Sequence, residues 1–176
     1  LCIGAVGCGK DVSSSADAAK TEIVYASTKD IMDINPHLYT GEMAAQNMVF
    51  ESLVTINNDG EIEPCLATSW GISEDGLEYT FKLREDVTFT DEEKFNADAV
   101  KQNFDAVLSN FDRHAWLELV NQIDKTEVVD EYTFKMTLKK AYYPSLTELA
   151  LTRPFRMISP KCFIDGETKN GVNGYA

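Results

Sequence analysis

The 176-residue sequence is poor in the side chains and motifs on which many enzymes depend. It holds only two histidines, and it lacks a phosphate-binding glycine loop, a GxSxG nucleophile elbow and an HExxH pattern. A carboxylate cluster occurs at residues 90–94, but it lies in a polar stretch before a predicted helix, which is typical of a solvated loop. These absences favour a protein that binds its ligand without converting it, so no enzyme is predicted.

Positive charge is also scarce. The chain has 16 Lys and Arg against 29 Asp and Glu, which gives a formal net charge of −13 at pH 7. Because a phosphate backbone is bound by a basic surface, this composition argues against nucleic acid as a partner. No apolar run is long enough to span a bilayer. With 44% hydrophobic residues, the composition is that of a globular protein with one sizeable core.

The N-terminal segment predicts a membrane anchor. The letters "AVGC", ending at Cys8, resemble a bacterial lipobox, where signal peptidase cuts before the cysteine and a lipid is attached to its sulfur. The alternative is a remnant of a short core strand, but the polar run "GKDVSSSADAAK" is typical of a flexible tether. We therefore predict a signal-peptide remnant at 1–7, a lipid-anchored tether at 8–20 and a folded unit at 21–176.

The remaining cysteines show no CxxC or zinc-like spacing. A disulfide between Cys65 and Cys162 is one option in an extracellular protein, and two separate buried thiols are the favoured one.

Hydrophobic periodicity predicts a mixed α/β fold. Strands are expected where apolar and polar residues alternate, and helices where good helix formers or regularly spaced apolar residues occur. Asn96 is the expected N-cap of the clearest helix. Turns are expected at Asp59-Gly60 and Asp75-Gly76. The predicted strands are 21–27, 77–83, 127–129 and 132–138, and the predicted helices are 42–54, 95–110 and 143–151.

Several long runs resemble the extracytoplasmic solute-binding family 5 of ABC importers, which includes dipeptide, oligopeptide and nickel binders. The runs "PCLATSW" (64–70) and "SEDGLEYTFKLREDVTF" (73–89) match two ordered family segments, and "FNADAVKQNF" resembles the helix that follows. The runs "NPHLYT", "RHAWLELVNQI" and "AYYPSLTELALTRPFR" resemble the nickel-binding branch. The resemblance implies an α/β fold of periplasmic-binding-protein-like type II (cluster C), in a protein whose two lobes close on the ligand. Residues 21–176 would be the N-terminal portion only, which is an incomplete solute-binding domain.

The resemblance also implies a ligand and a site. Nickel would arrive inside a small organic chelate, whose carboxylates a guanidinium can bind through two parallel hydrogen bonds. Arg113 and Arg153 match chelate-binding arginines, and Trp116 matches an aromatic wall. Tyr39 and Met43 match cleft residues, although the spacing between them is one residue shorter than in the family. No metal ligand is implied in this portion, and neither histidine corresponds to the one that reaches the metal in the family.

Each residue singled out also has a plainer interpretation that involves no ligand. These interpretations are surface pairing with carboxylates for Arg153, core packing for Trp116, loop anchoring for Tyr39, packing for Met43, a surface or supporting position for His114 and loop hydrogen bonding for His37.

The function predicted from these observations is the solute-binding component of a nickel ABC importer. It would be a monomer, lipid-anchored on the extracytoplasmic face of the cell membrane or periplasmic, and it would deliver chelated nickel to permease subunits. One alternative is a dipeptide or oligopeptide binder of the same fold, and another is a receptor or chaperone-like interaction protein without a transport role. A cleft histidine in the rest of the protein would favour nickel, whereas a cleft aspartate would favour a peptide.

Overall fold

The computed structural model describes residues 24–39, 41–164 and 167–172. The predicted signal-peptide remnant, Cys8 and the tether lie outside the described residues. None of the helices in the described part of the chain is both long enough and apolar enough to cross a membrane.

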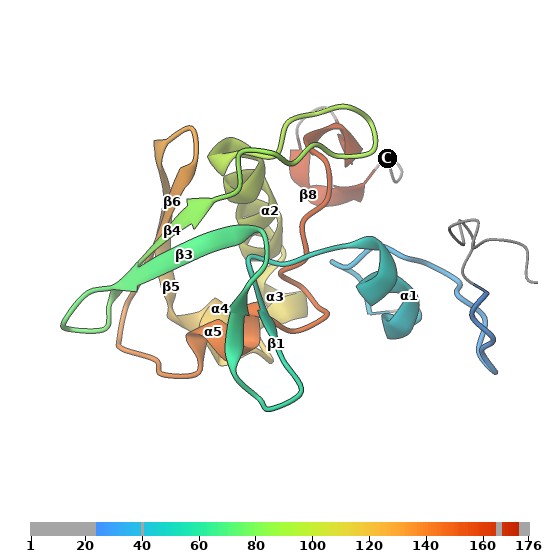
Figure 1. The fold of residues 1–176 in the computed structure, drawn as a ribbon, viewed down its shortest axis with the longest axis horizontal. Helices are drawn as coiled ribbons and strands as arrows, with labels where there is room; N and C mark the ends of the chain where they lie inside the picture. The colour runs from blue at the N-terminus through green and yellow to red at the C-terminus, as the bar shows by residue number, and fades with distance from the viewer. Residues whose placement is uncertain (1–23, 40, 165–166, 173–176) are drawn as a thin grey trace, which may run out of the picture.

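A four-stranded antiparallel sheet is the largest sheet of the described residues, and it lies on one side of α2 (Figure 1). Alternation of apolar and polar residues puts one side of each inner strand into the core, and Phe81 stands opposite Phe134 across the strand pair. The strand predicted at 77–83 and the predicted hairpin that ends at 138 are confirmed. In spatial order the strands are β3 (Ala67–Ile72), β4 (Glu78–Leu83), β6 (Thr133–Leu138) and β5 (Ile123–Asp130).

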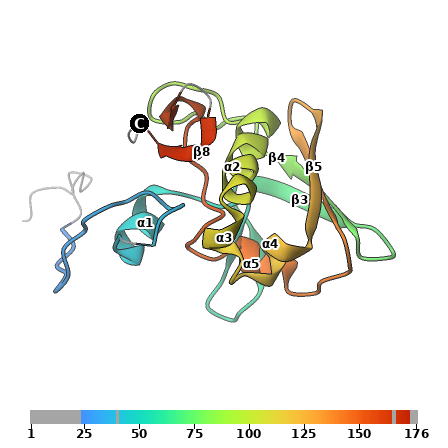
Figure 2. The same cartoon turned by 180° about the vertical axis from the view of Figure 1, so that it is seen from behind.

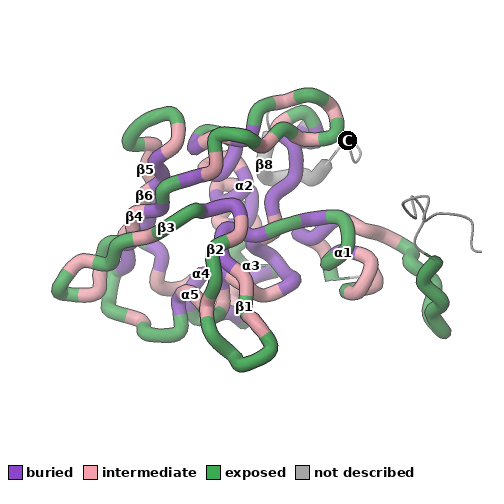
Figure 3. Tube along the Cα trace, in the orientation of Figure 1, coloured by how far each residue is buried: buried purple, intermediate pink, exposed green. Residues whose placement is uncertain are grey.

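The helix α2 (Ala97–Ser109) packs against β5 and β6. It begins where predicted, because the Asn96 side chain accepts a hydrogen bond from the Ala99 N–H at 2.9 Å. Its Phe104 ring lies 4.8 Å from the ring of Phe134 and 5.1 Å from that of Phe155. In Figure 3 the buried segments gather where α2 meets the sheet.

The other elements surround this core. The helices α3, α4 and α5 lie together at one end of the sheet (Figure 2). The hairpin of β1 and β2 turns at Gly60, whose positive φ of 83° suits glycine, as its sequence predicts. The bounds are α1 Met43–Val49, β1 Val54–Ile56, β2 Ile62–Pro64, α3 Phe111–His114, α4 Glu118–Gln122, α5 Ser145–Leu149, a 3-10 helix Pro160–Cys162, β7 Phe163–Ile164 and β8 Glu167–Val172.

Two predicted elements differ from the structure. Residues 24–27 form no strand, because a sequence of high β-propensity still needs a partner strand and Val24 is 85% exposed. The helix predicted at 42–54 ends at Val49, because Phe50 is extended and the chain then runs into the core at Leu53. The disulfide alternative is also wrong, since both Cys65 and Cys162 are free thiols.

Candidate functional site

The fold brings Tyr39, Trp116 and Arg153 together from three distant parts of the chain. Tyr39 lies in the loop before α1, Trp116 follows α3, and Arg153 follows α5. The Trp116 Nε1–H donates to the Tyr39 hydroxyl oxygen at 2.8 Å. The Arg153 guanidinium carbon lies 5.8 Å from the centre of the Tyr39 ring, within the range of a cation–π contact. Tyr39 is therefore the centre of the cluster.

His114 is the residue behind Tyr39. The His114 Nδ1 lies 2.8 Å from the Tyr39 hydroxyl oxygen, and the His114 side chain is fully buried. Burial, together with the Arg113 charge, lowers the pKa of His114 to about 4, so the imidazole is neutral at pH 7. A surface position for His114 is therefore wrong, and it supports a neighbouring residue.

The hydrogen bonds of this cluster have a direction. An indole N–H only donates, so the Tyr39 oxygen accepts from Trp116. The neutral His114 ring offers a lone pair that can take the single hydroxyl proton of Tyr39. Donors and acceptors arranged head to tail in this way strengthen one another. Burial also raises the pKa of Tyr39, which keeps the hydroxyl protonated at pH 7.

Trp116 does not belong to the core. Its side chain is 61% exposed, so the core-packing interpretation is wrong. With the Nε1–H held by Tyr39, the ring is oriented while much of its surface stays open to solvent. An exposed, oriented aromatic ring can serve as a wall for a bound molecule.

Arg153 is buried and meets no carboxylate among the residues that the structure describes. Its side chain is only 8% exposed, which excludes the surface-pairing interpretation. Its Nε–H donates to the Gln46 Oε1 at 2.6 Å, and its Nη2 donates to the Gly41 carbonyl oxygen. Within the described ranges, no Asp or Glu oxygen lies at ion-pair distance from Arg153. No carboxylate of the described residues therefore balances the guanidinium charge in this site of low exposure.

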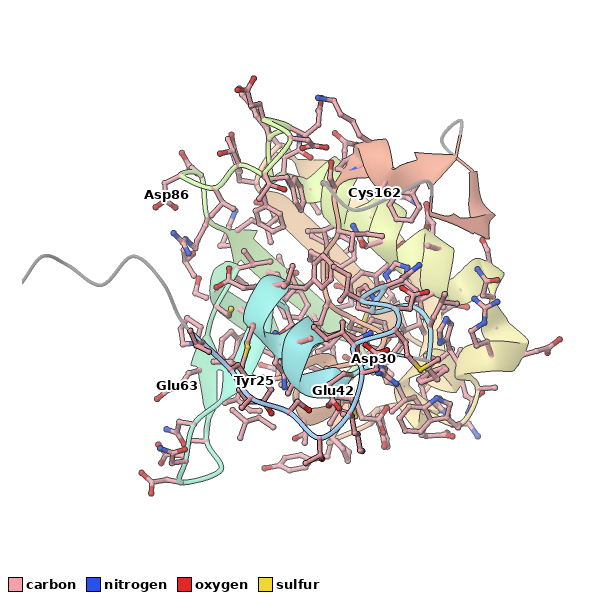
Figure 4. The ribbon with its side chains drawn as sticks, turned by 90° about the vertical axis from the view of Figure 1, so that its right-hand side faces the viewer. Tyr25, Asp30, Glu42, Glu63, Asp86 and Cys162 are labelled. Atoms are coloured by element: carbon pink, nitrogen blue, oxygen red, sulfur yellow. The ribbon has the colours of Figure 1, made fainter. Side chains whose placement is uncertain are left out.

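Met43 and Arg153 line the same open pocket, which has a volume of about 460 Å³. Figure 4 shows the segment that carries Asp30 passing beside the start of α1, where Glu42 lies. Met43 is 50% exposed, so its side chain is available to a molecule in the pocket. The complete lining is Lys29, Asp30, Met32, Gly41, Glu42, Met43 and Arg153.

Arg113 adds a second positive charge at some remove from the pocket. It is exposed on α3 and has no ion-pair partner among the residues that the structure describes. The Arg113 charge acts to lower the pKa of both Tyr39 and His114, so Arg113 lies close enough to influence the electrostatic potential of the cluster. Among the described residues, no hydrogen bond joins Arg113 to Tyr39 or Arg153.

Three residues of the site were not predicted from the sequence: Gly41, Gln46 and His114 in its buried role. A Cβ built on Gly41 would lie 1.5 Å from the Asp33 carbonyl oxygen, so only glycine fits this close approach of two backbone segments. Gln46 is fully buried on α1 and holds Arg153. The one signal in the sequence was Gly41, just before the predicted start of a helix. Its position in the sequence does not indicate that its carbonyl oxygen accepts from Arg153.

The arrangement is suited to an anion better than to a bare metal ion. Within the described residues, no group of three or more His, Cys, Asp or Glu could hold a metal. Guanidinium groups recognise carboxylates, and an aromatic ring covers the apolar part of a small molecule.

Comparison with known proteins agrees with the fold. The family model of bacterial extracellular solute-binding proteins, family 5 Middle, matches residues 61–173. The nickel-binding periplasmic protein of Escherichia coli K12 is 51% identical over 156 residues, which are 88% of this chain and 30% of that protein. The glutathione-binding protein GsiB of Salmonella typhimurium is 33% identical over 161 residues, 90% of this chain and 31% of that protein.

Solved structures show the same similarity. NikA from Brucella suis, in complex with Fe(III)-EDTA, superposes with a TM-score of 0.79 and 55% identity over 81% of this chain and 29% of NikA. NikZ from Campylobacter jejuni, in complex with Ni(L-His), gives 0.67 and 31% over 82% of this chain and 28% of NikZ. The chain spans about three tenths of the length of these relatives. The predicted periplasmic-binding-protein-like α/β fold is confirmed, and the chain belongs to the bacterial extracellular solute-binding proteins, family 5.

Proposed function

We propose that the chain is part of the solute-binding component of a nickel ABC importer, which captures Ni(II) inside a small organic chelate. The observation that carries this proposal is the buried Arg153, whose charge meets no carboxylate among the described residues, in a chain of net charge −13. A buried charge without an opposite charge beside it is costly, and a ligand carboxylate would compensate it. The names of the E. coli, Brucella and Campylobacter relatives support a nickel chelate as the source of that carboxylate.

In the proposed mechanism, the protein binds and delivers its ligand and catalyses no reaction. Arg153 binds a chelate carboxylate, and Arg113 attracts the anion and neutralises a further carboxylate. Trp116 and Tyr39 form an aromatic wall, and Met43 contacts the ligand in the adjoining pocket. Because the chelator supplies nitrogen ligands that nickel prefers, a site poor in histidine can still select the metal. The loaded protein, acting as a monomer, then docks on the permease subunits.

The test is a calorimetric titration of the complete protein with three probes: Ni(II) alone, Ni(II) with L-histidine, and glutathione. We expect clear binding only when nickel and chelator are both present, because the arginines need the carboxylates that bare nickel lacks. Binding of bare Ni(II) with equal affinity would overturn the chelate mechanism. Binding of glutathione in place of the nickel chelate would favour a peptide binder, the function indicated by the name of the GsiB relatives.

We also propose an extracytoplasmic location with a lipid anchor on Cys8. The support is the lipobox-like "AVGC" followed by a polar tether. Changing Cys8→Ser in the complete gene should block processing or release the protein from the membrane, because the thioether needs sulfur. Fractionation of cells followed by immunoblotting measures this. A Cys8→Ser protein that stays membrane-bound at wild-type levels would show that the anchor lies elsewhere.

A further inference from the structure

Gln46 uses both ends of its side-chain amide inside the protein. The residue is 0% exposed. Its Nε2 donates to the Asn35 carbonyl oxygen at 2.9 Å, and its Oε1 accepts from the Arg153 Nε–H at 2.6 Å. A carbonyl oxygen only accepts, so the bond to Asn35 settles which end of the amide is nitrogen. Gln46 must therefore present an oxygen, without charge, to Arg153.

The contacts of Arg153 occupy one edge of its guanidinium. The Nε–H points to Gln46, and an Nη2–H points to the Gly41 carbonyl. These two N–H groups form the side edge of the planar fork. The end edge, formed by Nη1 and the second N–H of Nη2, has no hydrogen-bond partner among the described residues. A carboxylate can bind this end edge through two parallel hydrogen bonds.

We propose that Gln46 is a positioning residue for the chelate-binding site: it holds the side edge of Arg153 with an uncharged oxygen and leaves the charge and the end edge to a ligand carboxylate. This inference rests on the proposed function and narrows its ligand to chelates that present a two-oxygen carboxylate to Arg153. A glutamate at position 46 would place an acceptor of the same size at the same point. Its negative charge would neutralise Arg153 from within the protein, before any ligand arrives.

The decisive variant is therefore Gln46→Glu, studied in the complete protein with two probes that differ in charge. These probes are the Ni(II)–EDTA dianion and the uncharged Ni(II) complex of L-histidine. We expect the affinity for Ni(II)–EDTA to fall by on the order of a hundredfold, as when a buried charge pair is lost. The affinity for the L-histidine complex should fall by about tenfold or less, because less of its binding depends on net charge. A purely structural role would lower both affinities by the same factor.

A second variant keeps the inference testable if Gln46→Glu folds poorly. Gln46→Met removes the acceptor without adding charge, so Arg153 should lose its orientation and keep its charge. We expect a loss of about tenfold for both probes, and no further loss when Gln46→Met is combined with Arg153→Ala, because the effect passes through Arg153. A general disruption of the fold would lower the affinity in the Arg153→Ala background as well. The matched control is Gln102→Glu on α2, which makes the same change of charge on a half-buried residue without a hydrogen bond to Arg153 and should bind like the wild type.

The outcomes separate the inference from the proposed function. If the wild type binds both probes and the Gln46 variants bind them equally well, the role of Gln46 is wrong and the proposed function stands. If Gln46→Glu still lowers the affinity for Ni(II)–EDTA in an Arg153→Ala background, the effect does not pass through Arg153 and the inference is wrong. If the wild type binds neither probe, the proposed function fails, and this inference fails with it.

Discussion

Replacing Arg153 with alanine is expected to weaken the binding of a nickel chelate by the complete protein by about 2–5 kcal/mol. The substitution removes the buried cation that would meet a ligand carboxylate, and a charge left without its partner in a site of low exposure is costly. It also leaves the Gln46 Oε1 and the Gly41 carbonyl oxygen without their donor. No other single substitution in this portion of the protein should lower the affinity for the chelate more.

Arg153→Lys should lose much of the same affinity. The ammonium of lysine is a compact charge, and it cannot hold Gln46 and Gly41 while also offering a two-pronged contact to a carboxylate. Trp116→Ala should cost less, because an exposed ring contributes packing without a charge.

The measurement is calorimetric titration with Ni(II) and L-histidine. Arg84→Ala is the matched control, since it removes the same charge from a surface arginine paired with Asp86 at 3.0 Å. The control should bind like the wild type. If Arg153→Ala bound the chelate with wild-type affinity, Arg153 would not belong to the site, whatever Arg113 contributes.

The parts of the fold that were predictable are those set by local sequence. In the strand β4 every second residue is buried and the residues between are exposed or half-buried, and period two is a direct consequence of strand geometry. The start of α2 follows from a side chain that caps its own helix three residues on. The hairpin of β5 and β6 pairs neighbours in the chain, so its partner needs no long-range information.

The parts that were not predictable depend on distant partners. Residues 24–27 have the composition of a strand, but composition does not show whether a partner strand is present. His114 follows an exposed arginine on a short helix, and nothing near it in the sequence indicates that Tyr39, 75 positions earlier, takes it into a buried hydrogen bond. The contact of Gln46 with Arg153 spans 107 positions.

The candidate site shows the same division. The resemblance to a family identified Tyr39, Met43, Trp116 and Arg153, and the structure places these residues around one cluster and its adjoining pocket. It did not identify the residues that hold them, because Gln46 and Gly41 act through a buried amide and a backbone carbonyl. Such supporting contacts depend on three-dimensional neighbours and leave no spacing pattern in the chain.

A second large effect is expected from Phe104→Ala, which should lower the free energy of unfolding of this unit by about 3–5 kcal/mol. Phe104 is 0% exposed and joins α2 both to the sheet, through Phe134, and to the segment after α5, through Phe155. Truncation leaves a cavity that rigid neighbours on two sides cannot fill. Hydrogen exchange of the β4 and β6 backbone amides in the complete protein measures the local free energy of opening.

Variants of Phe104 separate the stability of the fold from the binding of the ligand. Phe104→Leu fills most of the space and should cost less than about 1.5 kcal/mol. Both variants should keep nearly wild-type affinity for the nickel chelate at temperatures where the protein is folded, because Arg153 is held by Gln46 and Gly41 and makes no hydrogen bond to Phe104. A folded Phe104→Ala protein that loses chelate affinity as strongly as Arg153→Ala would contradict this. It would mean that packing of Phe155 against α2, two residues beyond Arg153, positions the guanidinium as much as its own hydrogen bonds do.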